Sequence, residues 1–184
     1  GFDPHIERTV AIKTVRKDLV DPDLAVQFMG RFKNEARAAG RLQHPNIGRL
    51  FDGGMTPDGR PYFVMEYLDA KPVTEYCDER ALSSDARIDL LIAVCDAVEY
   101  AHGHLVIHRD LKSSNILVSD DGQVHLLDFG IAKLLTDGQA RETELTRLGG
   151  RALTPEFAAP EQITGAPVTT AADVYALGVL LYGL

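Results

Sequence analysis

The chain has 184 residues, 45% of them hydrophobic, which suits one folded domain or two small lobes and is unlike the composition of a disordered chain. Its formal net charge of -8 argues against general affinity for nucleic acid or anionic membranes, so a polyanion has to be recognised at a local site. No apolar run is long enough to predict a membrane span within this chain, and the two cysteines lack the spacing of a zinc site or a disulfide framework.

The first third of the chain is predicted to form a small sheet with one helix. Residues 9–15 (TVAIKTV) are rich in β-branched side chains and predict a strand. Apolar residues recur at helical spacing through residues 24–43 and predict an amphipathic helix after it. Two more strands, separated by the turn TPDG, are predicted at residues 47–54 and 60–68.

The rest of the chain is predicted to be mainly helical, with the boundary in YLDAKP at residues 67–72. A long helix is expected from Ser83, with Ser84 as its N-cap, and Gly103 can close it. Helical character returns only after Pro160. The buried face of the long helix is expected to comprise Ile88, Leu91, Ile92, Cys95 and Val98.

Polar and charged residues cluster on both sides of a predicted hairpin. Apolar runs at residues 116–118 and 124–127, with the turn SDDG between them, predict its two strands. The loop before the hairpin reads HRDLKSSN (108–115), and DFG (128–130) follows its second strand. Since the two open ends of a hairpin meet at one edge, this layout brings two acids and an amide together.

Four motifs in a fixed order connect the chain to a known family. VAIK (10–13) lies on the first predicted strand, HRDLKSSN and DFG flank the hairpin, and AAPEQ (158–162) lies near the start of the last helical region. Together they resemble the motif set of the protein kinases. The LKSSN form of the catalytic loop resembles that of serine/threonine kinases, and the sequence HPNIGRLFDGG resembles that of the bacterial members.

The resemblance implies an α+β, bilobal protein-kinase-like fold. A small β-sheet lobe with one helix would occupy residues 1–68, and a mainly helical lobe residues 69–184. The family's glycine-rich loop is absent ahead of Lys13, and Leu184 precedes the family's later helices. We therefore expect a kinase domain truncated at both ends, which as an isolated fragment binds ATP weakly and exposes apolar surface at both cuts.

The resemblance also assigns roles in phosphoryl transfer, which spreads negative charge over the transferred group. Asn115 and Asp128 would supply oxygen ligands to Mg²⁺, a hard ion. Asp110 would accept or orient the proton of the substrate hydroxyl, and Lys112 would reach the γ-phosphate. The α- and β-phosphates would be held by Lys13 in an ion pair with Glu35.

The adenine of ATP is expected to meet the stretch MEYL. By resemblance the backbone of Glu66 and Leu68 contacts the base, and Met65 lies behind it. Ala11 and Leu117 would sandwich the ring. These are backbone and apolar contacts, so the side-chain identities of Glu66 and Tyr67 carry little information.

The threonine-rich segment between DFG and AAPEQ resembles an activation loop. Arg109 is the residue that in such kinases pairs with a phosphate on this loop, because a phosphate adds acceptor oxygens and charge. We expect autophosphorylation at Thr146, with Thr143 second, and a possible self-association that enables it. Thr154 better matches a structural threonine that contacts the catalytic loop.

Several residues of the motifs are expected to be structural. His108 should pack against Phe129, and Asp173 should anchor the backbone of the catalytic loop. Cys77 is interpreted as a partly exposed thiol and Cys95 as a buried one, neither with a chemical role.

The expected activity is that of an ATP-dependent protein serine/threonine kinase in signalling, with a protein substrate and a cytoplasmic location. The parent protein could be tethered to a membrane with this domain on its cytoplasmic side. A catalytically inactive kinase-fold interaction module ranks second, because such relatives generally lack one of the groups that Lys13, Asp110 and Asp128 supply. A small-molecule phosphotransferase ranks third.

Overall fold

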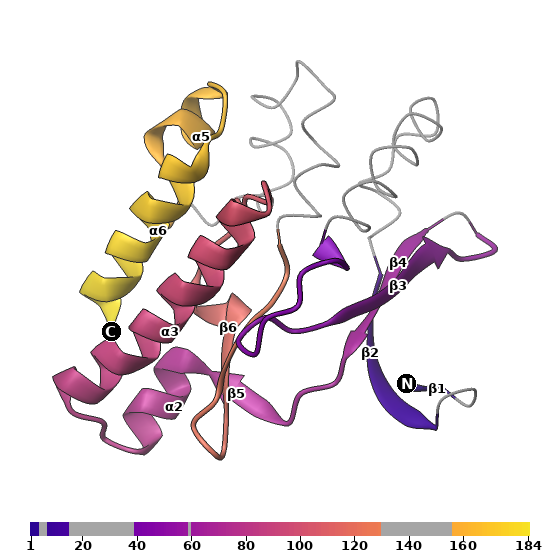
Figure 1. Cartoon of the computed structure of the whole chain (residues 1–184), viewed down its shortest axis with the longest axis horizontal. Coiled ribbons are helices and arrows are strands. Elements are labelled where there is room, and N and C mark those ends of the chain that lie inside the picture. Colours follow the sequence, from indigo (N-terminus) through magenta and orange to yellow (C-terminus); the bar gives the residue numbers. More distant parts are fainter. Residues whose placement is uncertain (4–6, 15–38, 59, 130–155) are drawn as a thin grey trace.

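A computed structural model of the chain describes residues 1–3, 7–14, 39–58, 60–129 and 156–184. Figure 1 shows a twisted sheet on one side of the molecule and a group of helices with a second, smaller sheet on the other. In these ranges no helix is both long and apolar enough to cross a membrane.

The first sheet is antiparallel, with strand order β1-β2-β4-β3. It confirms the three strands predicted in the first third of the chain. Val10 on β2 and Phe63 on β4 are buried, with 3% and 4% exposure, and β-branched and aromatic residues suit such positions. Pro61, the first residue of β4, is buried as well. A short first strand, β1, was not predicted; the four strands are β1 (Phe2–Asp3), β2 (Arg8–Thr14), β3 (Leu50–Met55) and β4 (Pro61–Glu66).

The second sheet contains the predicted hairpin, whose strands β6 (Ile116–Ser119) and β7 (Val124–Leu126) pair antiparallel. Its turn contains Gly122 with φ of +85°, a conformation that glycine adopts without steric cost. The strand β5 (Ala70–Pro72) pairs with the other edge of β6. The two sheets thus separate in sequence near the predicted boundary, while the division into domains at residue 68 stays a prediction.

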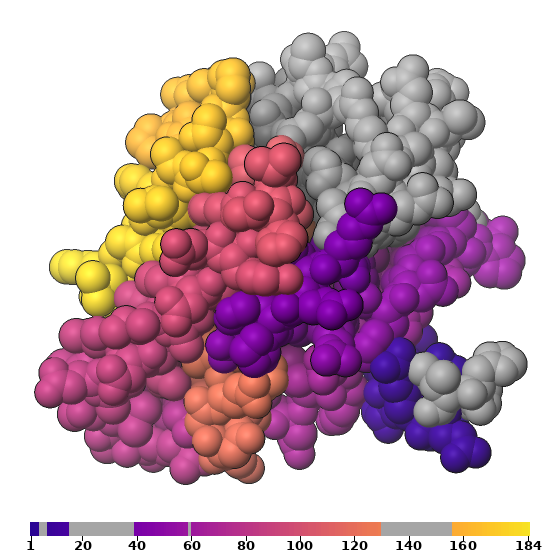
Figure 2. Space-filling view, in the orientation of Figure 1, coloured from indigo at the N-terminus to yellow at the C-terminus, as the bar shows by residue number. Residues whose placement is uncertain are grey.

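Residues before that boundary also pack on the second sheet. Ile47 forms a parallel bridge with Leu126. It has 4% exposure and belongs to the core around the helices. In Figure 2 the dark purple segment that contains Ile47 lies between the helices and the strands of the first sheet. This pairing explains why β3 begins at Leu50 and not at Ile47, where the strand was predicted.

The long helix lies where the sequence predicts it, but part of its predicted buried face is exposed. It is α3 (Ser84–Gly103), and its N-cap is Ser83, whose side chain accepts a hydrogen bond from the backbone of Ala86, so the assignment of Ser84 as N-cap is wrong. Ile88 and Ile92 are 43% and 52% exposed. Apolar residues occur around most of this helix, and the face with small alanines approaches the sheet and α6; the residues buried on it are Leu91, Val94, Ala97, Val98 and Ala101.

The thiol assignments are also reversed. Cys77 is fully buried because it lies on a short helix, α2 (Val73–Glu79), which was not predicted and packs on β5 and β6. Cys95 is only partly buried, since it lies to one side of the buried face of α3. Burial raises the pKa of both thiols, which disfavours the reactive thiolate and agrees with a structural role.

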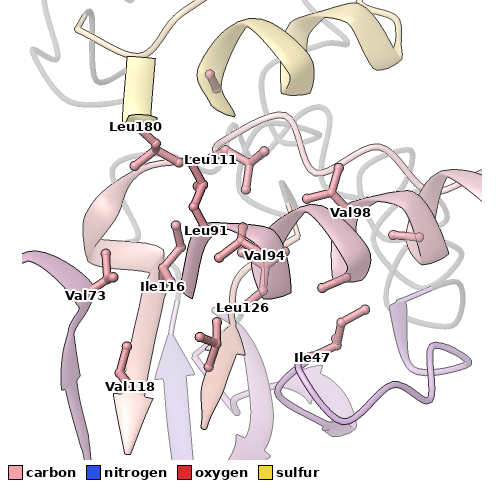
Figure 3. Close-up of a cluster of buried hydrophobic side chains, with 14 of the residues drawn as sticks. Ile47, Val73, Leu91, Val94, Val98, Leu111, Ile116, Val118, Leu126 and Leu180 are labelled. Carbon is pink, nitrogen blue, oxygen red and sulfur yellow. The ribbon is translucent and has the colours of Figure 1, made fainter. Parts of the chain in front are cut away.

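The main core lies between α3, the second sheet and α6 (Thr170–Gly183). Figure 3 shows Leu91, Val94 and Val98 of α3 over Ile116 and Leu126 of the hairpin. Ile116 and Leu126 have no exposed surface, so this core holds both strands that lead to the HRDLKSSN and DFG motifs. The remaining helices in the described ranges are the single-turn η3 (Ser113–Asn115) and α5 (Pro160–Thr164).

Candidate active site

The loop before the hairpin is anchored by Asp173, in the first turn of α6. Its carboxylate accepts hydrogen bonds from the backbone N–H groups of His108 and Arg109, both at 2.8 Å, as predicted. His102 Nε2 lies 2.7 Å from the same carboxylate. Asp173 is 1% exposed, and a buried carboxylate is stable only when such donors surround it. Arg109 has φ of +67°, a strained backbone that the anchor maintains.

His108 is part of the scaffold, as expected. The side chain is fully buried, and its ring centroid lies 4.7 Å from that of Phe129. Its Nε2 lies 2.8 Å from the carbonyl oxygen of Leu127, while Nδ1 accepts from the backbone N–H of Asp110 at 3.3 Å. Burial lowers the pKa of His108, against the opposing charge of Asp173. The neutral ring therefore ties the catalytic loop to the residue before Asp128.

Three of the predicted site residues meet directly after His108. Lys112 Nζ lies 2.9 Å from Asp110 Oδ2. The Asn115 amide donates to the backbone oxygen of Asp110 at 2.8 Å and contacts its carboxylate at 3.3 Å. The side chain of Asp110 is 27% exposed, so this carboxylate is held by the loop and still reaches solvent. Such an acid can take or orient a proton of a bound hydroxyl.

Asp128 joins the hairpin to the first sheet. Its Oδ2 lies 2.5 Å from the Nζ of Lys13 on β2. The backbone of Asp128 has φ of +60°, an uncommon conformation for a residue with a side chain. The structure therefore brings Lys13 to Asp128. The predicted partner Glu35 lies outside the described residues, as do Thr143, Thr146 and Thr154.

The two predicted metal ligands lie on adjoining backbone segments. The N–H of Leu127, the residue before Asp128, donates to the carbonyl oxygen of Asn115 at 2.9 Å. Because the Asn115 amide nitrogen faces Asp110, its Oδ1 is the atom suited to a cation. An amide oxygen and a carboxylate fit Mg²⁺, which takes few protein ligands and keeps waters. Among the described residues no three His, Cys, Asp or Glu side chains form a metal cluster, and this pair does not depend on one.

The residues expected near adenine lie on β2, β4 and β6, except Leu68, which lies between β4 and β5. Ala11 of β2 is opposite Met65 of β4, and Leu117 of β6 is opposite Pro72 of β5. The carboxylate of Glu66 accepts from the backbone N–H of Arg49 at 3.2 Å, so this side chain has a structural partner. The contacts of Ala11, Glu66, Leu68 and Leu117 with a nucleotide stay predictions.

Gln162 has a structural role that was not predicted from the sequence. It is 7% exposed, and its Nε2 donates to the carbonyl oxygen of Arg109 at 2.9 Å. Its Oε1 accepts from the backbone N–H of Ala159 at 3.1 Å. A glutamine at the third position of a helix that begins with proline is a capping signal that could have indicated it. AAPEQ thereby braces the strained residue before Asp110.

These features define a protein kinase domain. The sequence profile described as the protein kinase domain matches residues 2–184, and the chain belongs to this family. A probable serine/threonine-protein kinase PknB of Lactococcus lactis is 38% identical over 179 residues, which cover 97% of this chain and 27% of that protein.

Other similar proteins carry related names. Serine/threonine-protein kinase PknB of Mycolicibacterium smegmatis is 37% identical over 185 residues, covering 98% of this chain and 28% of that protein. Serine/threonine-protein kinase Pkn1 of Myxococcus xanthus is 41% identical over 188 residues, covering 100% of this chain and 26% of that protein. The chain thus spans about a quarter of the length of these curated relatives.

Proposed function

We propose that the intact protein transfers the γ-phosphate of ATP to serine or threonine hydroxyl groups of other proteins and so acts in signalling. The observation that carries this proposal is the grouping of Asp110, Lys112 and Asn115 in one braced loop, backed by the Lys13–Asp128 pair. Phosphoryl transfer is catalysed mainly by positioning the reactants and stabilising charge, and these side chains can do both. The names of the similar proteins support the serine/threonine class.

Each side chain then has a distinct role. When bound, ATP supplies the phosphoryl group and Mg²⁺ neutralises charge on its oxygens. Asp110 orients the substrate hydroxyl and accepts its proton. Lys112, which the structure places 2.9 Å from Asp110, puts positive charge next to that acid. Asn115 and Asp128 would hold the metal ion, and Lys13 the α- and β-phosphates, with Glu35 as its ion-pair partner.

The adenine would lie against the first sheet and the hairpin. Ala11 and Leu117 are partly buried, which suits residues that cover an apolar ring. The backbone of Glu66 and Leu68 would supply the hydrogen bonds to the base. The pairing of the Glu66 side chain with Arg49 supports a contact through the backbone rather than through the carboxylate.

Regulation and location follow from the same proposal. Phosphorylation at Thr146 or Thr143, by a second copy of the protein, would place a phosphate for Arg109, which directly precedes Asp110. We place the domain on the cytoplasmic side, because ATP is available there. The free thiols Cys77 and Cys95 support a reducing compartment.

A transfer assay with the intact protein tests the proposed function. With γ-labelled ATP and Mg²⁺, wild type should label protein substrates, and Asp110→Asn should lose at least about a hundredfold of the rate, since it removes the proton acceptor. Asp120→Asn is a matched control, because this aspartate is 93% exposed at the far turn of the hairpin. An inactive interaction module would bind partners and transfer nothing, while a small-molecule phosphotransferase would label no protein.

A further inference from the structure

The segment ahead of β3 runs along the strand that leads to Asp128. The N–H of Leu126 donates to the carbonyl oxygen of Asn46 at 2.8 Å, and the N–H of Gly48 donates to the carbonyl oxygen of Leu126 at 3.0 Å. The Asn46 side chain donates to the carbonyl oxygen of Val124 at 2.8 Å. The strand β7 is therefore bonded on both edges, to β6 and to residues 46–48.

Gly48 lies where this segment meets Leu127. A Cβ atom at position 48 would be 2.3 Å from Leu127 Cδ2, well inside van der Waals contact, whereas its nearest backbone atom would be 3.7 Å away. The backbone of Gly48 is not left-handed, so its φ does not require glycine. The side chain of Leu127 occupies the space that a larger residue would need.

Leu127 in turn fixes the residue after it. Its N–H donates to the carbonyl oxygen of Asn115, and its own carbonyl oxygen faces His108 Nε2 at 2.8 Å. Asp128 follows with φ of +60°. A strained residue keeps such a conformation only when its surroundings determine it from several sides. The contacts of Leu127 on Asn115, His108 and Gly48 supply that determination on the N-terminal side of Asp128.

We propose that Gly48 is a positioning residue for Asp128: the absence of a side chain at position 48 lets Leu127 pack there and thereby sets the geometry of the metal-binding carboxylate. This inference rests on the proposed function for its effect on catalysis. The contact joins Gly48, in the segment before β3, to Leu127, and neither residue belongs to the DFG or VAIK motif. Gly48 touches no reacting group and acts only through Leu127.

The proposal is tested in the intact protein by enlarging residue 48 and then, in a second variant, also shortening residue 127. Gly48→Ala should displace the side chain of Leu127, raise the Mg²⁺ concentration for half-maximal transfer and lower kcat about tenfold, which is less than the roughly hundredfold cost of misplacing a catalytic group by about 1 Å. The double variant Gly48→Ala/Leu127→Ala removes the clashing atoms and should recover most of the loss. KM for ATP should change less than the Mg²⁺ requirement, since Lys13, which would hold the α- and β-phosphates, lies on β2 and is not substituted.

A crowded glycine elsewhere provides the matched control. A Cβ at Gly54 would be 2.8 Å from the hydroxyl of Tyr62, on the first sheet, so Gly54→Ala introduces a clash that does not involve Leu127. It should change stability without changing the Mg²⁺ requirement. A Gly48→Ala variant with unchanged Mg²⁺ requirement and kcat, or a double variant that recovers nothing, would overturn the proposal.

A second readout does not depend on activity. Hydrogen exchange without nucleotide or metal reports the N–H of Leu127, which is bonded to Asn115. Gly48→Ala should speed its exchange several-fold and the double variant should slow it again. If wild type transfers no phosphate, the proposed function fails and this exchange still tests the Gly48 contact. If wild type is active and the exchange rates do not differ, the Gly48 inference alone fails.

Discussion

The ammonium of Lys13 lies 2.5 Å from a carboxylate oxygen of Asp128, across the junction between the first sheet and the hairpin. Both side chains reach solvent, with 51% and 22% exposure, and exposed pairs of this kind contribute about 0–1 kcal/mol to stability. The pair therefore adds little to stability, and it joins two residues of the motifs, so its proposed role in phosphate transfer can be tested apart from folding.

Replacing Lys13 should therefore separate activity from stability. Lys13→Met should abolish phosphate transfer and change the free energy of unfolding by less than about 1 kcal/mol. Urea unfolding and a transfer assay on the same preparation measure both. Lys71→Met is the control, because Lys71 forms an exposed 2.5 Å pair with Glu79 on α2, away from the site, and should keep full transfer. Transfer that survives in Lys13→Met would contradict the assignment.

Removing the buried carboxylate of Asp173, unlike replacing Lys13, should lower stability as well as activity. Asp173→Ala leaves the N–H groups of His108 and Arg109 without their acceptor, so it should cost about 3 kcal/mol of stability as well as transfer activity. Asp89→Ala, at an exposed position of α3, is the control and should change stability little. Chemical denaturation checks both variants, and equal midpoints for Asp173→Ala and wild type would refute the anchoring role.

Protonation of His108 should weaken the fold at low pH. Its pKa in the folded protein is lowered by burial, so below the unfolded value of about 6.5 the unfolded chain binds the extra proton and stability falls as pH falls. The contribution is up to about 1.4 kcal/mol per pH unit below that value. His108→Gln removes this titration while it keeps a donor for Leu127. Its stability should fall less steeply than wild type between pH 6.5 and 5, and parallel curves would contradict the burial effect.

The C-terminal end of α3 can be stabilised. Leu105 has φ of +60° and is 94% exposed, and it follows a helix end where Val106 N–H bonds to the carbonyl oxygen of Ala101. Glycine is favoured at such a position, so Leu105→Gly should raise the free energy of unfolding by about 0.5–1 kcal/mol. Leu105→Ala removes the same side chain and keeps the strain, so it should leave stability unchanged. Thermal unfolding distinguishes the two, and equal effects would refute the argument.

The sequence predicts which motif residues come together better than it predicts the packing. Asp110, Asn115 and Asp128 follow from the motifs, because a hairpin necessarily brings both of its ends to one edge. The rotation of α3 does not follow, since Ile88 and Ile92 fit the same helical period as the residues that are buried. The roles of Gln162 and Gly48 depend on contacts with Arg109 and Leu127, distant in sequence, which no local pattern encodes.

The central claim is tested most directly by identifying the labelled amino acids after transfer. The intact protein, γ-labelled ATP, Mg²⁺ and a mixture of candidate protein substrates are incubated, and the labelled proteins are hydrolysed for phosphoamino-acid analysis. We predict label on serine and threonine with wild type and none with Asp128→Asn. Label confined to small molecules, or equal protein labelling by wild type and Asp128→Asn, would contradict the proposed kinase activity.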